Sequence, residues 1–253
     1  AGTPDNYRAN ANVNFKGEKY NFFTNLGYNN SKSPGNSKSN GTYLDQFGDV
    51  AYYMDEKRDN ERVRKGHNVD FGLDLYITPS ITWTNTVGFR DQRGDNTFDV
   101  DYLNYDINKN LNYSRNRFST ERDENMNFEY STRFEKNFAK DGHKLIVDGN
   151  VSTSRDDENS VVTDLTEGNV NKLLNERTKN FETQNRMIGS VDYVLPIGEN
   201  AQFEAGYRGS YTDLVTDFGV EALNNGIWEP NQMYNNIFQY KEKIHAFYTQ
   251  YGS

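Results

Sequence analysis

Apolar and aromatic residues alternate with polar ones along most of this chain. In about nine segments the period of two continues for roughly nine to twelve residues, whereas ordinary strands average about five or six. In the first segment, residues 7–15, every second side chain is Tyr, Ala, Val or Phe, and the positions between them are Arg or Asn. This pattern predicts long strands with one apolar face and one polar face.

The segments form four predicted hairpins followed by a ninth strand. Within each hairpin a tight turn separates two alternating runs, and the turns are expected at Lys16–Glu18, Thr78–Ser80, Ala139–Gly142 and Pro196–Asn200. The eight paired runs are residues 7–15 and 22–28, 69–77 and 81–89, 126–134 and 145–151, and 187–195 and 203–211. The ninth strand places Ile244, Ala246 and Tyr248 on its apolar face and runs to the end of the sequence.

Long polar stretches separate the hairpins and are predicted to be loops. They cover roughly Lys32–Lys65, Gly94–Glu124, Asp156–Thr183 and Thr216–Tyr240. Short turns at one rim and long loops at the other are typical of outer-membrane β-barrels, in which the short turns are periplasmic and the long loops extracellular. A soluble β-sandwich also buries one face of each strand, so alternation alone leaves that fold open.

Composition favours the barrel. Among 253 residues there are 18 Tyr and 16 Phe, and barrels carry such aromatics in girdles at both membrane interfaces. Charged residues at mid-strand positions on the second face suit a water-filled lumen. No run reaches the roughly 18 to 20 apolar residues of a spanning helix, and the mean hydropathy is -0.98. The net charge of -9 argues against a nucleic-acid binder, and the absence of cysteine excludes thiolate metal sites.

Five stretches resemble the barrel region of the outer-membrane β-barrel proteins of Bacteroidetes, which are relatives of the TonB-dependent receptors. They are YRANANVNF at 7–15, HNVDFGLDLYITP at 67–79, DYVLP at 192–196 with FEAGYRGSY at 203–211, and KEKIHAFY at 241–248. The resemblance implies an up-and-down transmembrane barrel of roughly twenty-two strands, filled by an N-terminal plug and energised by TonB to import a bulky nutrient.

Residues 1–253 are accordingly expected to be one partial barrel domain in the outer membrane of a Gram-negative bacterium, without the plug and the remaining strands. The implied partners are outer-membrane lipid, that plug and those strands, and, for the parent protein, TonB and a surface lipoprotein. A soluble or surface-attached β-sandwich that binds glycan or protein through its loops is the alternative. A barrel without transport is a third possibility.

No enzymatic activity is expected. His67, His143 and His245 fall on separate predicted elements, without the spacing of a zinc site or a Ser-His-Asp arrangement. No glycine-rich phosphate loop follows any predicted strand, and no organic cofactor is expected.

Acidic residues mark two candidate cation sites. Asp91, Asp95, Asp99 and Asp101 fall in one predicted loop, where carboxylates are candidate calcium ligands, although a solvated acidic loop is the alternative. Asp156, Asp157 and Glu158 lie at the outer end of a predicted strand, as a second candidate for a cation or for cation-bridged lipid phosphates.

Trp228 lies in the sequence GIWEP on a predicted long loop, where an exposed indole is a candidate to stack on a sugar ring. Four charged side chains are expected on the lumen side of the barrel wall: Arg133, Asp192, Glu204 and Arg208.

Overall fold

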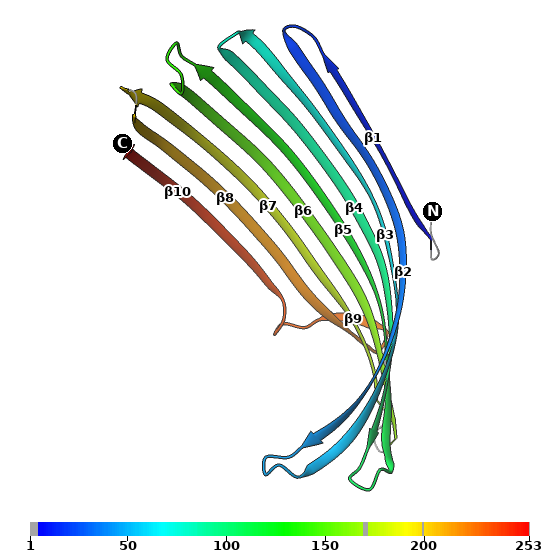
Figure 1. The fold of residues 1–253 in the computed structure, drawn as a ribbon. Coiled ribbons are helices and arrows are strands. Elements are labelled where there is room, and N and C mark those ends of the chain that lie inside the picture. The colour runs from blue at the N-terminus through cyan, green and yellow to red at the C-terminus, as the bar shows by residue number, and fades with distance from the viewer. Residues whose placement is uncertain (1–4, 169–171, 199, 253) are drawn as a thin grey trace.

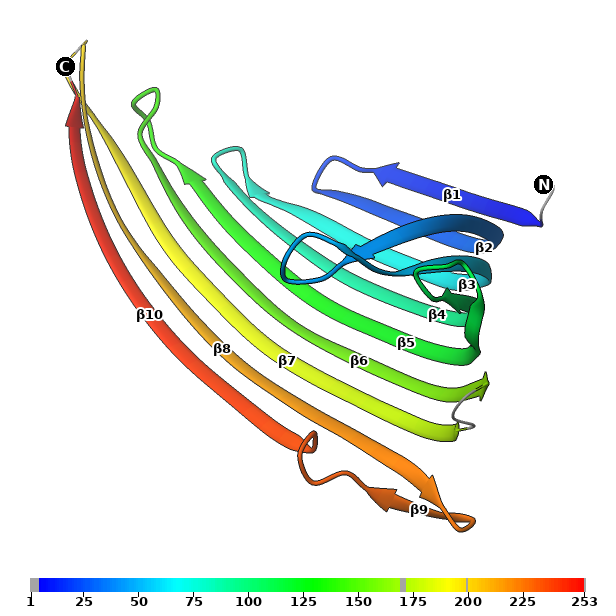
Figure 2. The same ribbon diagram turned by 90° about the horizontal axis from the view of Figure 1, so that it is seen from below.

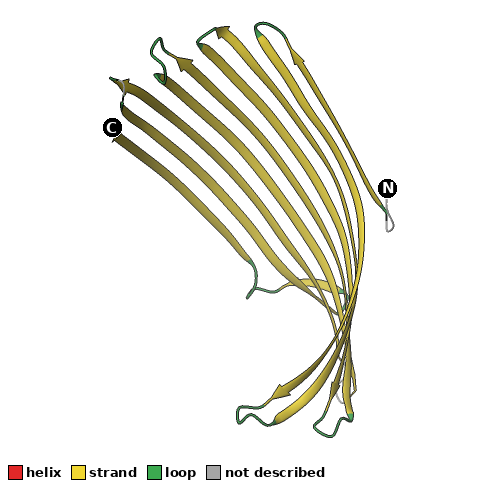
Figure 3. Cartoon of the chain, in the orientation of Figure 1, coloured by secondary structure: helices red, strands yellow, loops and turns green. Residues whose placement is uncertain are grey.

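The computed structural model describes residues 5–168, 172–198 and 200–252. Within these residues ten strands form one antiparallel sheet, and no helix is present that could span a membrane (Figures 1 and 3). The strands are β1 (Asn6–Lys16), β2 (Tyr20–Leu44), β3 (Val50–Thr78), β4 (Ile81–Tyr105), β5 (Leu111–Asn137), β6 (Lys144–Gly168), β7 (Lys172–Ile197), β8 (Ala201–Asn224), β9 (Ile227–Pro230) and β10 (Asn236–Gly252).

Each strand pairs with its neighbours in chain order, which is the predicted up-and-down arrangement. Only β9 departs from it. This four-residue strand pairs with the last residues of β8 alone, and β10 pairs with the rest of β8. The sheet is curved and does not close on itself, so β1 and β10 form two free edges (Figures 1 and 2). The nine predicted strands are all present, and β9 is an additional one.

The predicted long loops are wrong: the polar stretches continue the strands. The β2–β3 ladder, for example, runs without interruption from Tyr20 opposite Leu75 to Tyr43 opposite Tyr52. Backbone ladders do not require apolar side chains, so the strands continue where apolar alternation stops. Strands β2 to β8 have 24 to 29 residues, or about 80 to 95 Å at roughly 3.3 Å per residue. A tilted transmembrane strand needs only about 9 to 11 residues.

Tight turns join β1 to β2, β3 to β4 and β5 to β6 at one rim, and β2 to β3 and β4 to β5 at the other. The four turns predicted from the sequence are present within a residue or two, apart from Glu199, which lies outside the described residues. At the opposite ends, the β2–β3 and β4–β5 turns share one geometry. The Asp45 side chain accepts the amides of Phe47 and Asp49 at 2.8 and 3.0 Å, and Asp106 accepts those of Asn108 and Asn110, both at 2.8 Å.

The sheet has one apolar and one polar face, because directly opposed residues of adjacent strands point to the same side and successive residues alternate. One row of opposed residues consists of Tyr20, Leu75, Trp83, Phe134, Val147, Val191, Tyr207 and Phe247. The next row, on the opposite side, consists of Asn21, Asp74, Thr84, Arg133, Asp148, Ser190, Arg208 and Ala246. We call the two sides the apolar face and the polar face.

The few buried side chains among the described residues lie on the polar face. They are Val100, Ile146, Val162 and Val220, with Asn96, Asn104 and Asp164. Large hydrophobic side chains of the apolar face remain open: Val147 is 37% exposed, whereas its chain neighbour Ile146 is 9% exposed. Curvature crowds side chains on the concave side of a sheet and separates them on the convex side. The pattern of buried side chains therefore indicates that the polar face is the concave one.

The predicted orientation of β10 is wrong by one residue. Ile244, Ala246 and Tyr248 lie opposite Ser210, Arg208 and Gly206 on the polar face, and the apolar face of β10 carries His245, Phe247, Thr249 and Tyr251. Apolar residues occur at both odd-numbered and even-numbered positions of this strand, so alternation alone did not determine which set lies on the apolar face. The hydroxyl of Tyr248 donates to Asp192 Oδ1 at 2.7 Å, and this bond requires the observed phase.

Candidate functional site

The apolar face carries a band next to the rim of short turns. On each long strand the band occupies about five alternate positions, which span about 26 Å along the strand at roughly 3.3 Å per residue. Aromatic side chains lie at both of its borders. Those near the short turns are Phe15, Tyr20, Trp83, Phe134, Tyr193, Phe203 and Tyr251, and those at the far border are Tyr7, Tyr28, Phe89, Phe128 and Tyr211. An apolar band between two aromatic girdles is the lipid-facing surface of a transmembrane barrel.

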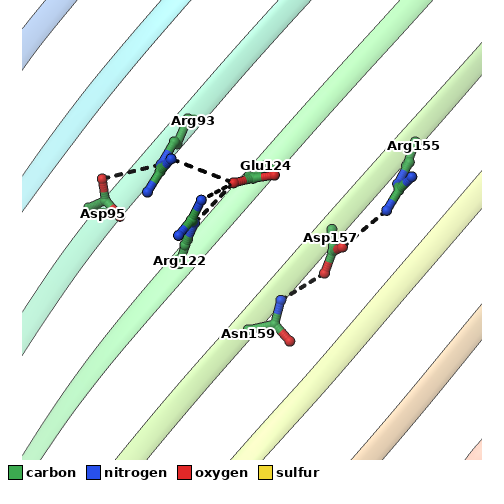
Figure 4. Close-up of polar contacts among 7 residues, drawn as sticks. All are labelled: Arg93, Asp95, Arg122, Glu124, Arg155, Asp157 and Asn159. Carbon is green, nitrogen blue, oxygen red and sulfur yellow. Dashed lines mark hydrogen bonds and ion pairs between the residues drawn. The ribbon is translucent and has the colours of Figure 1, made fainter.

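Beyond the far border the same face becomes densely charged. We define the charged belt as Arg93 and Asp95 of β4, Arg122 and Glu124 of β5, and Arg155, Asp157 and Asn159 of β6 (Figure 4). Arg93 Nη1 lies 3.8 Å from Glu124 Oε1, and Arg93 Nε lies 3.6 Å from Asp95 Oδ2. Arg122 Nη2 lies 2.5 Å from the same Glu124 oxygen. The contact between Arg93 and Glu124 joins β4 to β5, and the other two lie within one strand each.

On β6 the belt continues with two polar contacts around one carboxylate. Arg155 Nη2 lies 3.4 Å from Asp157 Oδ2, and the Asn159 amide donates to Asp157 Oδ1 at 2.7 Å. The guanidinium carbon of Arg155 lies 4.8 Å from the centre of the Phe181 ring on β7. The three arginine side chains are 45 to 57% exposed, so each ion pair stabilises the fold by less than about 1 kcal/mol.

The four aspartates predicted to form a calcium site lie on β4 and not in a loop. They share the apolar face, but β4 is extended, so Asp91 and Asp101 are separated by about 33 Å at roughly 3.3 Å per residue. Asp91 lies 3.9 Å from His67, and Asp99 and Asp101 both accept from Asn116 Nδ2, at 2.7 and 2.8 Å. The described residues contain no group of three His, Asp or Glu side chains placed to hold a metal ion.

Trp228 lies on β9 and not in an irregular loop. The guanidinium carbon of Arg177 is 4.7 Å from the centre of its indole, so one face of the ring is occupied. Arg177 also pairs with Glu221. A recess of about 640 Å³ lies beside this cluster, lined by Lys179, Asp217 and Ile237 among others. Sugar stacking on the free face of the indole stays a prediction.

The four side chains expected to face a lumen all lie on the polar face. Arg133 Nη1 lies 3.6 Å from Asp148 Oδ1 on β6, and Asp192 accepts the Tyr248 hydroxyl. Glu204 accepts from Gln202, and Arg208 lies opposite Ser190.

Sequence reasoning missed a cluster of carboxylates on the polar face beyond the band. We call it the acidic patch: Glu121 and Asp123 of β5, Asp156 and Glu158 of β6, and Glu182 of β7. Burial and the nearby charges of Asp123 and Glu182 raise the pKa of Asp156. Burial and the charges of Glu121, Asp156 and Asp123 raise the pKa of Glu158. The patch escaped detection because its members come from three strands.

The structure also divides the predicted cluster Asp156–Glu158. Asp156 and Glu158 point to the polar face and belong to the acidic patch, whereas Asp157 points to the apolar face and belongs to the charged belt. Successive residues of a strand face opposite sides, so three consecutive carboxylates cannot form one site.

An extended two-faced sheet, with an aromatic-bordered apolar band on one side and charges on the other, defines the wall of a transmembrane β-barrel. In agreement, residues 136–253 match the model of the Outer membrane protein beta-barrel family. The matched residues contain β6 to β10 and make up slightly less than half of the chain. The match indicates an outer-membrane location, as the sequence predicted. No curated protein and no solved structure matches the chain.

Proposed function

We propose that this chain is part of the wall of an outer-membrane transporter related to the TonB-dependent receptors, which imports a bulky nutrient. The observation that carries the proposal is the pair of adjacent rows on opposite sides of the sheet. The row through Trp83 and Tyr207 is apolar or aromatic on eight strands, and the row through Arg133 and Arg208 is almost entirely polar.

The energetics of charge burial favour a wet or protein-filled space on the polar side. An Arg or Lys on the lipid face near mid-depth costs about 2 to 4 kcal/mol. Arg133 and Arg208 lie at the depth of the apolar band, so their side must meet water or another protein domain and not lipid. A plug domain inside the barrel is such a partner.

The free edges require more strands. Unpaired backbone groups of β1 and β10 are not satisfied by lipid, so in a membrane both edges need β-partners. By the rule that short turns are periplasmic, the strand extensions and the charged belt lie on the extracellular side. The extensions would contact an incoming ligand or a surface lipoprotein before it reaches the lumen.

The soluble β-sandwich has less support. It needs a second sheet against the apolar face, and the described residues form one sheet whose apolar face stays open. A barrel that does not transport has a wall of the same geometry as a transporter. Only a measurement of nutrient uptake therefore separates these two functions.

The wall geometry is tested by single cysteines, which the chain permits because it has none of its own. In the full-length protein in outer membranes, Cys at 208 should react with a water-soluble maleimide, and Cys at 207 should react only with a lipid-soluble one. Equal labelling of both positions by the water-soluble reagent would contradict a membrane wall.

Transport is tested in cells by deleting the gene and, separately, TonB. Growth on a panel of glycans, metal chelates and cobalamin should fail for the same nutrient in both strains. A nutrient that depends on the gene but not on TonB indicates passive passage, and no dependence at all indicates a structural barrel.

A further inference from the structure

The charged belt begins where the lipid-facing band ends. On β5, Met126 follows the border residue Phe128 on the same face and Glu124 is the first charged residue beyond it, and on β6 Arg155 lies directly opposite Met126. The belt therefore lies at the height of lipid headgroups and on the side of the sheet that faces them. This position is independent of whether the barrel transports anything.

Arg93 and Arg155 keep most of their hydrogen-bond donors available, whereas Arg122 donates to Glu124 from both Nε and Nη2. Arg93 and Arg155 lie 3.4 to 3.8 Å from their carboxylate partners, which is longer than a charge-assisted hydrogen bond of about 2.7 to 2.9 Å. Each guanidinium has five N–H donors in a planar fork that fits phosphate oxygens. Phe181 holds the Arg155 guanidinium by stacking, so its edge remains open to a ligand.

The belt alternates its charges between β4 and β5, whereas two carboxylates oppose each other across β5 and β6. Arg93 lies opposite Glu124, Glu124 opposite Asp157, and Asp95 opposite Arg122. The three arginines are thus interleaved with three carboxylates. The arginines of this pattern suit phosphate groups, because guanidinium donors bind phosphate oxygens.

We propose that Arg93, Arg122 and Arg155 bind the phosphate groups of a phosphorylated glycolipid of the outer leaflet. The three guanidinium groups come from adjacent strands and are staggered in height, so they contact more than one phosphate of the same headgroup. When lipid is absent, Asp95, Glu124 and Asp157 pair with these arginines. The belt would fix the vertical position of the barrel wall in the membrane.

The test compares two triple variants of the full-length protein. The belt variant is R93Q/R122Q/R155Q, and the control is R64Q/R90Q/R117Q, whose arginines lie on the polar face of the same strands or of a neighbouring one. Both are purified from outer membranes in mild detergent, and the phosphate and glycolipid that co-purify are measured by native mass spectrometry. Circular dichroism and heat-modifiable gel mobility check that both variants fold.

Wild type and the control should retain glycolipid, and the belt variant should lose it. In nanodiscs that contain the glycolipid, the belt variant should bind it at least about tenfold more weakly, because charge-assisted contacts to phosphate are lost. Millimolar inorganic phosphate should not displace the lipid. Equal retention by wild type and the belt variant overturns the proposal, and so does equal binding to nanodiscs of phospholipid alone. Neither result depends on uptake, so failure here leaves the proposed transport function standing.

Discussion

Tyr207 and Arg208 are consecutive residues of β8 that lie on opposite faces of the sheet. Tyr207 lies opposite Val191 and Phe247, and its hydroxyl is 2.7 Å from His245 Nδ1. Arg208 lies opposite Ser190 and Ala246. The two residues therefore provide a lipid-facing site and an inward-facing site at the same depth in the membrane.

Tyr207→Arg should destabilise the protein in a bilayer far more than Arg208→Ala. Tyr207 lies midway between Phe203 and Tyr211 at the band borders, so the introduced charge meets lipid near mid-depth and costs about 2 to 4 kcal/mol. The free energy of unfolding of the full-length protein from phospholipid vesicles measures both changes. Equal losses would count against the assignment of the apolar face to lipid.

The turn Asp106–Asn110 should depend on its first side chain. Hydrogen bonds from Asn110 and Asn108 lower the pKa of Asp106. For an acid with a lowered folded-state pKa, the stabilisation is full above its ordinary pKa and is lost as the pH falls through the folded value. Asp106→Ala should therefore accelerate hydrogen exchange at the far ends of β4 and β5 at neutral pH but hardly in strong acid.

A second substitution in the same turn, Lys109→Gly, should have the opposite effect on hydrogen exchange. Lys109 has a φ of 64°, a region that costs an L-residue roughly 1 kcal/mol relative to glycine, and the equivalent position in the β2–β3 turn is Gly48. Lys109→Gly should slow exchange in this hairpin. If both variants leave exchange unchanged, the turn geometry is wrong.

The acidic patch should make the strand extensions more stable in mild acid than at neutral pH. Because the pKa of Glu158 is raised on folding, the folded state binds the proton more tightly, and stability rises as the pH falls through the raised value toward the ordinary one. Glu158→Gln should reduce this dependence, leaving the part due to Asp156, and stabilise the protein at neutral pH by up to about 1 kcal/mol, as expected for relief of cross-strand repulsion.

Asp157→Asn is the control for that measurement. It changes the adjacent carboxylate, which faces the charged belt and pairs with Arg155. It should leave the pH dependence intact. Denaturation of the full-length protein at pH 5 and pH 7.5 compares the variants, and an unchanged slope in Glu158→Gln would refute the electrostatic explanation.

The sequence predicted the band but not what lies beyond it. Alternation located strands such as 203–211 because lipid selects apolar residues at every second position, and this signal stops at the far border. Beyond it, pairs such as Arg177 with Glu221 support the ladder without apolar periodicity. The acidic patch and the charged belt depend on register between strands, as does the phase of β10. One strand read alone does not contain that information.

The sheet has two free edges, β1 and β10. All eleven residues of β1 are exposed, and β10 pairs only with β8, so each edge strand presents a row of backbone donors and acceptors. The apolar face, moreover, is not covered by any described element. Residues 1–253 expressed alone should therefore aggregate, require detergent or pair edge to edge, because neither water nor lipid satisfies both an apolar face and open edges. Sedimentation of the purified segment in plain buffer measures its state, with the same segment in detergent as the control. A soluble monomer that unfolds cooperatively in plain buffer would refute the partial-barrel interpretation and favour the sandwich.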